Sequence, residues 1–129
     1  MEIQGIEKLR GIENWSIWKF AIRNLLRGKV DAYEVCIGEI LKPEQLAIED
    51  KDFNQAEYDA KFKAWDRGDR AASQIIIKSL ESKVMALLVS CETAREIWLK
   101  LHSIFEQRTK QAAHTVQTEF FNFSKNPAD

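Results

Sequence analysis

The stretch from Leu9 to Arg27 constrains the fold of this chain more than any other. Five apolar residues recur in it at steps of 3, 4, 3 and 1, and these are Trp15, Trp18, Ile22, Leu25 and Leu26. This spacing follows one face of an α-helix. Each of the two indoles offers about 150–250 Å² for burial, so large pieces of chain must cover them. We therefore expect this helix to nucleate the core of the fold.

Both ends of this first helix carry recognisable signals. Asn14 is a good N-cap, because its side-chain oxygen can accept a free backbone N–H of the first turn. Gly28 suits a left-handed residue just past the end. Residues 1–13 form a lead-in segment whose apolar residues recur every third position, and we expect it to lie over the helix.

The length and composition favour one helix-rich domain over residues 1–129. The chain of 129 residues is 45% hydrophobic and 30% charged, with only five glycines and two prolines. A chain of this length buries about two thirds of its unfolded surface in a single core. We expect an ordered all-α domain.

The charge distribution and the cysteines limit the function classes. The net charge is −1, and it divides into +2 over residues 1–28, −5 over residues 29–66 and +2 over residues 67–129. Strong phosphate binding normally needs a marked basic excess, which argues against this segment holding nucleic acid by itself. Two cysteines and the lack of a signal region or an apolar span predict a cytoplasmic protein with no membrane contact.

The middle of the chain predicts two helices joined by an acidic connection. Residues 30–38 suit a short helix that ends near Gly38, and a strand is the weaker alternative. Residues 41–53 contain Pro43 and a charged cluster, and we expect an exposed connection with one helical turn after the proline. Asn54 then caps a long helix that reaches Leu80, with Gly68 inside it as a kink or break.

The last third of the chain carries the clearest helix start. Thr93 and Glu96 form a capping box ahead of an apolar helical pattern, after a short apolar turn over residues 84–88. A final helix is expected from Thr109 to about Phe123, before Asn126-Pro127 ends it. The sum is a compact bundle of about six helices.

Catalytic and metal-binding signatures are missing from the sequence. It contains no Gly-rich phosphate loop, no HExxH, no paired CxxC and no aspartic-protease triplet. A zinc site would have to combine two helix-surface histidines with two distant cysteines, without any close ligand pair: His102, His114, Cys36 and Cys91. We expect no enzyme activity, no cofactor, no metal and no small-molecule substrate.

Three blocks together resemble a known family, the Gag polyprotein of copia-type LTR retrotransposons. The first block comprises Gly11, Asn14, Trp15, Trp18, Lys19, Phe20, Ile22, Leu25 and Leu26. The second comprises Trp65, Asp69, Ala72, Ile75, Ile76 and Leu80. The third comprises Thr93, Ala94, Glu96, Ile97, Trp98, Leu101, Phe105 and Glu106. The blocks occur in the family's order and span about residues 9–125.

The resemblance implies the N-terminal lobe of a capsid, a helical bundle that assembles into the shell of a virus-like particle around the element's RNA. The matched residues are then structural. Leu9 stands where Phe is usual, the gap from Gly11 to Trp15 is one residue longer than in a common form of the signature, and the acidic stretch 42–64 is long for the family. The zinc knuckle that contacts RNA and the second capsid lobe are missing, so we expect a fragment or a host-retained relic.

Several alternatives stay open on the sequence alone. The chain can be a domesticated Gag-like adaptor or an interferer with particle assembly, and less readily a nucleic-acid-binding domain in its own right. Its partner in the first case is itself, as monomer or dimer when isolated, with RNA contacted mainly outside it. Lys19, Arg23 and Arg27 lie at steps of four on the first helix. We expect them on the side away from the tryptophans, as a solvated face or as an assembly or RNA-facing strip.

Overall fold

The computed structural model of the chain describes residues 6–44 and 53–107. Over these residues it is built from five α-helices: α1 (Trp15–Arg27), α2 (Ala32–Ile37), α3 (Gln55–Lys78), α4 (Ser82–Met85) and α5 (Ala94–Leu101). Short turns η1 (Ile12–Asn14), η2 (Ala86–Leu88) and η3 (His102–Glu106) join or extend them. The all-α fold class predicted from the sequence is confirmed.

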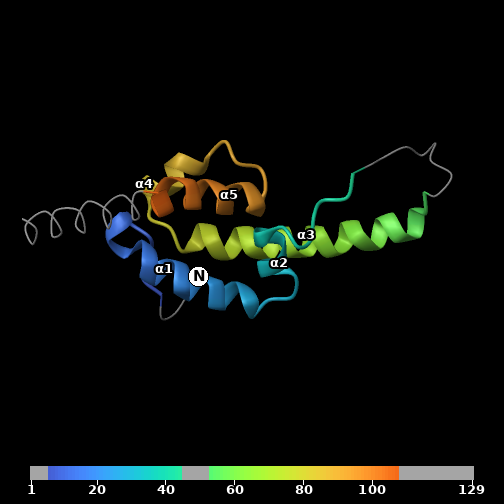
Figure 1. Cartoon of the computed structure of the whole chain (residues 1–129), viewed down its shortest axis with the longest axis horizontal. Helices are drawn as coiled ribbons and strands as arrows, with labels where there is room; N and C mark the ends of the chain where they lie inside the picture. The colour runs from blue at the N-terminus through green and yellow to red at the C-terminus, as the bar shows by residue number, and fades with distance from the viewer. Residues whose placement is uncertain (1–5, 45–52, 108–129) are drawn as a thin grey trace, which may run out of the picture.

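The long helix α3 is the axis of the bundle. Figure 1 shows α1 along one side of α3, α5 and α4 along the other, and α2 against its middle. The contacts agree, because α2 packs on α1, α3 and α5, and both α1 and α5 also contact α3. The N-terminal half of α3 extends past the other helices, and its first ten residues, 55–64, contain no buried side chain.

α1 has the predicted buried face but different ends. Trp15, Trp18, Ile22 and Leu26 are buried, and Leu25 is half-buried. The expected cap by Asn14 is wrong: its Oδ1 accepts from the Arg10 backbone N–H at 3.1 Å, and its Nδ2 donates to the Lys8 carbonyl at 2.9 Å. Gly28 is also not left-handed, with φ −77°, because the chain continues into a further turn.

The lead-in segment adds to the core through one backbone pairing. The Leu9 N–H donates to the Ser79 carbonyl at 2.8 Å, and the Glu81 N–H donates to the Leu9 carbonyl at 3.0 Å. This pairing forms a parallel bridge between Leu9 and Leu80, both fully or almost fully buried. The lead-in is therefore joined to the end of α3, and the hydrogen bonds of Asn14 with Lys8 and Arg10 hold the bend between the lead-in and α1.

α2 and α3 meet at a glycine. The helical prediction for residues 30–38 is confirmed, and Gly38 ends α2 with φ 84°. Gly68 does not break α3, contrary to expectation, because it is the contact point for α2. A Cβ on Gly68 would lie 2.5 Å from the Asp31 carbonyl oxygen and 2.6 Å from Val35 Cγ2. The missing side chain is what lets the two helices approach.

The predicted caps of α3 and α5 are present. The side chain of Asn54 accepts from the Glu57 N–H, and that of Thr93 accepts from the Glu96 N–H. The reciprocal half of the capping box is different, because Glu96 Oε2 accepts from the Glu92 N–H rather than from Thr93. The side-chain caps of α3 and α5 are therefore as predicted, and the reciprocal bond of the capping box is not.

Two predicted features fall partly or wholly outside the described residues. Of the acidic connection, residues 41–44 and 53 are described; Leu41, Lys42 and Glu44 are exposed, and Pro43 and Phe53 are half-buried. The helical turn expected after Pro43 and the final helix from Thr109 to Phe123 lie beyond the described ranges.

Candidate functional site

Most residues of the three sequence blocks lie in one buried cluster, so they form the scaffold of the bundle. The buried members are Asn14, Trp15, Trp18, Ile22, Leu26, Trp65, Ala72, Ile76, Leu80, Ala94, Ile97, Trp98, Leu101 and Phe105. Gly11, Lys19, Leu25 and Thr93 are half-buried, and Glu96 is exposed. Buried side chains determine the shape of the bundle, so any contact with a partner must be made by exposed residues.

The two tryptophans of α1 stand at the junction between α1 and the C-terminal end of the described chain. Trp15 and Trp18 are both 1% exposed and stack on each other with ring centroids 5.5 Å apart. Trp15 also stacks on Phe105 at 5.5 Å and meets the edge of His102 at 5.1 Å. Burial of each indole is worth about 4–6 kcal/mol by the area rule, as an upper estimate.

The indole N–H of Trp18 is satisfied by the end of α3. Trp18 Nε1 lies 3.1 Å from the Ser79 carbonyl oxygen and 3.0 Å from Ser79 Oγ. Ser79, 1% exposed, donates its own hydroxyl to the Ile76 carbonyl at 2.6 Å. A buried indole N–H without a partner is unfavourable, so this serine orients the ring as well as filling space.

Glu106 joins the end of η3 to α1. Its Oε2 accepts from Trp15 Nε1 at 2.7 Å and from Lys19 Nζ at 2.9 Å, and its Oε1 lies 3.1 Å from the same Lys19 nitrogen. The hydrogen bond from Lys19, followed by that from Trp15, lowers the pKa of the Glu106 carboxyl. Because these partners favour the ionised form, the carboxylate anchors the end of η3 to α1.

His102 lies in the same junction as a neutral side chain. Its ring packs 4.4 Å from the Trp98 ring, and its Nδ1 is 2.8 Å from the Trp98 carbonyl oxygen. A carbonyl only accepts, so the proton is on Nδ1. Burial lowers the pKa of His102 from its usual 6.5, since charging the ring among aromatic groups is unfavourable.

A second junction ties α5 to α3 and α2. Asp69 Oδ1 accepts from the Ala94 N–H at 2.7 Å, adding a cap to α5 from another helix. Arg95 Nη1 donates to the Cys36 carbonyl at 2.8 Å, which closes the end of α2. Burial, followed by the nearby Asp69 charge, raises the pKa of the Cys36 thiol to about 12, so this cysteine is not a nucleophile.

The sequence analysis did not single out Asp69, Ser79 or Glu106 as functional positions. Two of them had a signal, because Asp69 and Ser79 lie on the apolar stripe of α3 with Trp65, Ala72 and Ile76, at steps of 4, 3, 4 and 3. A polar residue on a buried stripe must find a partner in another element. Glu106 had no such signal, because its partners lie 87 and 91 positions away in the chain.

Of the three cations expected to form a strip on α1, two lie on the exposed side of the helix in the structure. Lys19 turns toward the core side, where its Nζ binds Glu106 and lies 5.9 Å from the Trp15 ring centroid. Arg23 and Arg27 are exposed. The placement of Lys19 on the side away from the tryptophans was wrong, because the angle of Lys19 on the helix lets its long side chain reach the carboxylate.

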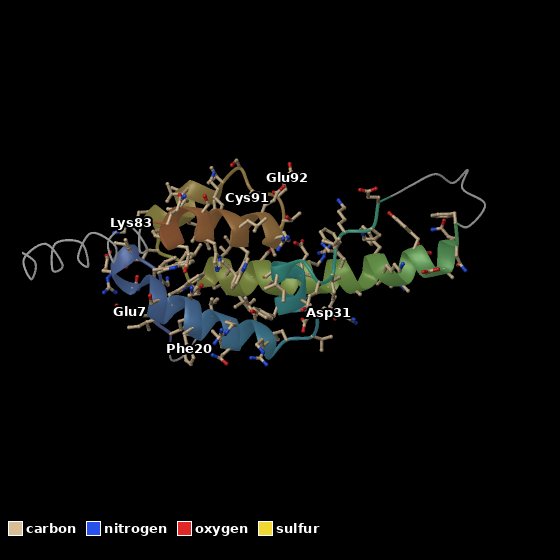
Figure 2. The ribbon with its side chains drawn as sticks, in the orientation of Figure 1. Glu7, Phe20, Asp31, Lys83, Cys91 and Glu92 are labelled. Atoms are coloured by element: carbon tan, nitrogen blue, oxygen red, sulfur yellow. The ribbon has the colours of Figure 1, made fainter. Side chains whose placement is uncertain are left out.

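Exposed apolar side chains occur on both sides of the bundle. On α1, Ile17 is 72% exposed and Phe20 is 63% exposed, and Figure 2 shows Phe20 at the outer edge of the molecule. Around η2 and α5 the exposed large residues are Leu87, Val89 and Leu99. Phe20 belongs to the first sequence block, yet it does not contribute to the core.

A shallow groove of about 790 Å³ runs between residues 39–44 and the projecting half of α3. Ile40, Pro43 and Tyr58 are among its lining residues, and Lys42 Nζ lies 5.2 Å from the Trp65 ring centroid at its edge. No histidine or cysteine lines it. Within residues 6–44 and 53–107 no group of His, Cys, Asp and Glu is arranged to hold a metal, and no helix is long and apolar enough to cross a membrane.

The comparisons with known proteins identify the family. Residues 22–129 match the family described as the gag-polypeptide of LTR copia-type. The first sequence block begins before this range, and the second and third lie within it. Searches of curated proteins and of solved structures each return no match. With more than four fifths of its length matched, this chain, an all-α bundle over its described residues, belongs to the copia-type LTR retrotransposon Gag family, whose role is structural.

Proposed function

We propose that the chain is one helical domain of a Gag capsid, which associates with copies of itself to build the shell of a virus-like particle that encloses the element's RNA. The family match over residues 22–129 is the observation that carries this proposal. The particle and the domain would be in the cytoplasm, with no small-molecule substrate or membrane partner.

The distribution of polar and apolar groups supports self-association. Most residues of the three sequence blocks are buried in the bundle, and large apolar side chains remain outside it, with Phe20 on α1 63% exposed and Val89 after η2 84% exposed. Shells are tiled by repeated contacts that are individually weak, and separate small apolar patches on a rigid domain suit such contacts.

The RNA would be held mainly by parts of Gag outside this domain. The chain has a net charge of −1, and Lys19, one of the three cations on α1, is neutralised by Glu106. Phosphate binding gains strength from many free cations, and two exposed arginines on one helix supply little.

Particle formation tests the proposal directly. The complete reading frame that encodes this chain is expressed, and the lysate is separated by sedimentation and examined by electron microscopy. We expect fast-sedimenting particles that protect RNA from added nuclease. A product that stays monomeric or dimeric at every protein and salt concentration would reject the shell function.

The genomic neighbourhood distinguishes an element's Gag from a domesticated adaptor. A reading frame that continues into a zinc knuckle, protease, integrase and reverse transcriptase indicates an element, whereas a lone short gene indicates a retained copy. A retained copy that interferes with assembly would lower particle yield when it is expressed together with a related element's Gag.

A further inference from the structure

The outer face of α1 carries a second stripe, opposite the one that packs inward. It comprises Glu13, Ile17, Phe20, Asn24 and Arg27, at steps of 4, 3, 4 and 3, with Glu13 supplied by η1. These steps follow one face of a helix, about half a turn from Trp18 and Ile22. The stripe therefore faces away from the bundle, on the side of α1 opposite the buried tryptophans.

All five side chains of this stripe are exposed. In Figure 2 no described helix lies beyond α1 on the side where Phe20 projects. Arg23 stands beside the stripe, with its guanidinium carbon 5.7 Å from the Phe20 ring centroid. Asn24 Nδ2 donates to the Phe20 carbonyl of its own helix at 2.9 Å, so that amide is already engaged.

The stripe is charged in opposite senses at its two ends. Glu13 is at the N-terminal end. It pairs with Arg10, which also pairs with Glu7, so these three side chains together have a net charge of −1. Arg27 and Arg23 are at the C-terminal end. Phe20 lies at the midpoint, because residues 13 and 27 are each seven positions away from it.

We propose that this face binds the same face of a second copy, with the two α1 helices antiparallel and a twofold axis passing next to Phe20. In that arrangement Glu13 faces Arg27 of the second copy, Ile17 faces the stem of Arg23, and the two Phe20 rings meet. A parallel pair would instead oppose Glu13 to Glu13 and Arg27 to Arg27. Charge complementarity therefore selects the antiparallel twofold contact.

The size of the face indicates a weak contact. Residues 13–27 span about 21 Å of helix, whereas a stable dimer buries about 800 Å² on each partner, which is more than one helix face provides. This inference rests on the proposed shell function, since a contact of this strength matters only where many copies are held together. It adds to that function the surface and the symmetry of one interface.

Charge reversal tests the pairing. We expect Glu13→Arg and Arg27→Glu, each alone, to weaken self-association of the chain about tenfold, because each twofold contact loses two attractions and gains two repulsions. The double variant, Glu13→Arg with Arg27→Glu, restores it. An equimolar mixture of the two single variants also associates, since every opposed pair in the mixed dimer has opposite charges. Sedimentation equilibrium at low salt measures all four.

Cross-linking tests the position of the axis. A cysteine at residue 20, Phe20→Cys, meets its own symmetry copy and forms a disulfide-linked dimer under mild oxidation, in a Cys91→Ser background. Lys83→Cys is the matched control, because Lys83 is exposed on the opposite side of the bundle from Phe20 in Figure 2. The Phe20→Cys dimer should exceed the control dimer by about tenfold, given a contact that concentrates the two thiols.

The outcomes separate this inference from the shell function. Particles or association that persist unchanged in both single charge variants, or a mixture that fails to recover, overturn the α1 contact and leave the shell function standing. Equal cross-linking of Phe20→Cys and Lys83→Cys also overturns the contact. Lys83→Glu controls for charge alone and should associate as the unmodified chain does. RNA retention that falls in Arg27→Glu and does not recover in the double variant assigns the face to nucleic acid instead.

Discussion

The two faces of α1 have the same length, the same backbone and opposite roles. The inner face holds Trp15 and Trp18 at 1% exposure, stacked and with both indole N–H groups bonded to other elements. The outer face holds Ile17 and Phe20 at 72% and 63% exposure.

The difference shows that one face of α1 holds the fold together while the other is left exposed. The inner side chains have hydrogen-bond partners from the end of α3 and from η3, so each indole is held by another element as well as by packing. The outer side chains have neighbours on α1 itself, so they can change with little effect on the bundle. The following predictions test that separation, beginning with the largest effect.

Trp18→Ala should disrupt the packing of the inner face of α1 and lower the stability of the fold. Removal of a buried indole leaves a cavity and leaves the Ser79 hydroxyl oxygen without its donor, while the Ser79 carbonyl keeps the Leu9 N–H, so the free energy of unfolding falls by about 3–5 kcal/mol. Urea unfolding followed by far-UV circular dichroism measures it. A loss below 1 kcal/mol would show that the indole is not a core anchor.

Gly68→Ala should show whether the steric cost at the α2–α3 contact exceeds the gain in helix propensity from alanine. Alanine favours a helix over glycine by about 1 kcal/mol, but its Cβ would lie 2.5 Å from the Asp31 carbonyl oxygen. Overpacking of this kind removes about 1–3 kcal/mol, so the variant is expected to be less stable on balance.

Gly28→Ala is the matched control for the glycine prediction. Gly28 is exposed with a right-handed backbone, and the closest atom to an added Cβ is a carbonyl of the same turn at 3.3 Å. Its stability should stay within about 0.5 kcal/mol of the unmodified chain. If Gly68→Ala proves as stable as Gly28→Ala, the close approach of α2 to α3 is wrong.

Glu106→Gln should weaken the link between η3 and α1 without emptying the core. The amide oxygen can still accept one hydrogen bond, but the ion pair with Lys19 is lost, and the partners are about one third exposed. We expect a loss of about 1 kcal/mol or less. Lys61→Gln, which removes an exposed pair with Glu57, controls for a surface ion pair and should change stability less.

Stability should fall as the pH drops below about 6.5. The pKa of His102 is lower in the folded chain than its usual 6.5, so the unfolded chain binds more protons there. The stabilisation is complete above pH 6.5 and is lost as the pH falls through the folded pKa. Lys19 and Glu106 are the charged groups near this ring.

Glu106 acts in the same direction at lower pH. The pKa of its carboxyl is below the usual 4.5, so its contribution is complete above pH 4.5 and is lost as the pH falls through the lower folded value. Urea midpoints at pH 7.5, 6.0, 5.0 and 4.0 should show both stages. His102→Gln should remove the first stage alone, and an unchanged pH profile in that variant contradicts the assignment.

Phe20→Ala should have the smallest effect on stability and so completes the comparison with Trp18→Ala. The exposed ring loses little burial, and the expected change is within about 0.5 kcal/mol. Thermal unfolding and sedimentation on the same sample measure fold and association separately. A destabilisation near that of Trp18→Ala would mean that the outer face belongs to the core.

Much of this fold could be predicted from local sequence alone. Trp15, Trp18, Ile22 and Leu26 were predicted to share a buried face, and they do, because a helical period records which side of a helix meets the core. The side-chain caps from Asn54 and Thr93 and the end of α2 at Gly38 were also predicted correctly. Each of these features depends on atoms within about one turn of chain.

Only the tertiary structure decided which groups from distant parts of the chain meet. Asn14 was predicted to cap α1 and instead holds the lead-in, because carbonyl and N–H groups of that segment reach it first. Gly68 was expected to interrupt a helix and instead admits α2. Lys19 was placed with Arg23 and Arg27 and instead binds Glu106, 87 positions away.

The physical reason is the range of the interactions. Helix periods, caps and turns are set by neighbours in the chain, so the all-α class and the buried face of α1 are properties of the sequence itself. Partners for a buried N–H, a missing Cβ or a long cation are set by packing between helices, which brings together residues that no local pattern connects. The sequence determined which side of α1 faces inward, and the packed bundle decided which of its other residues remain free for a partner.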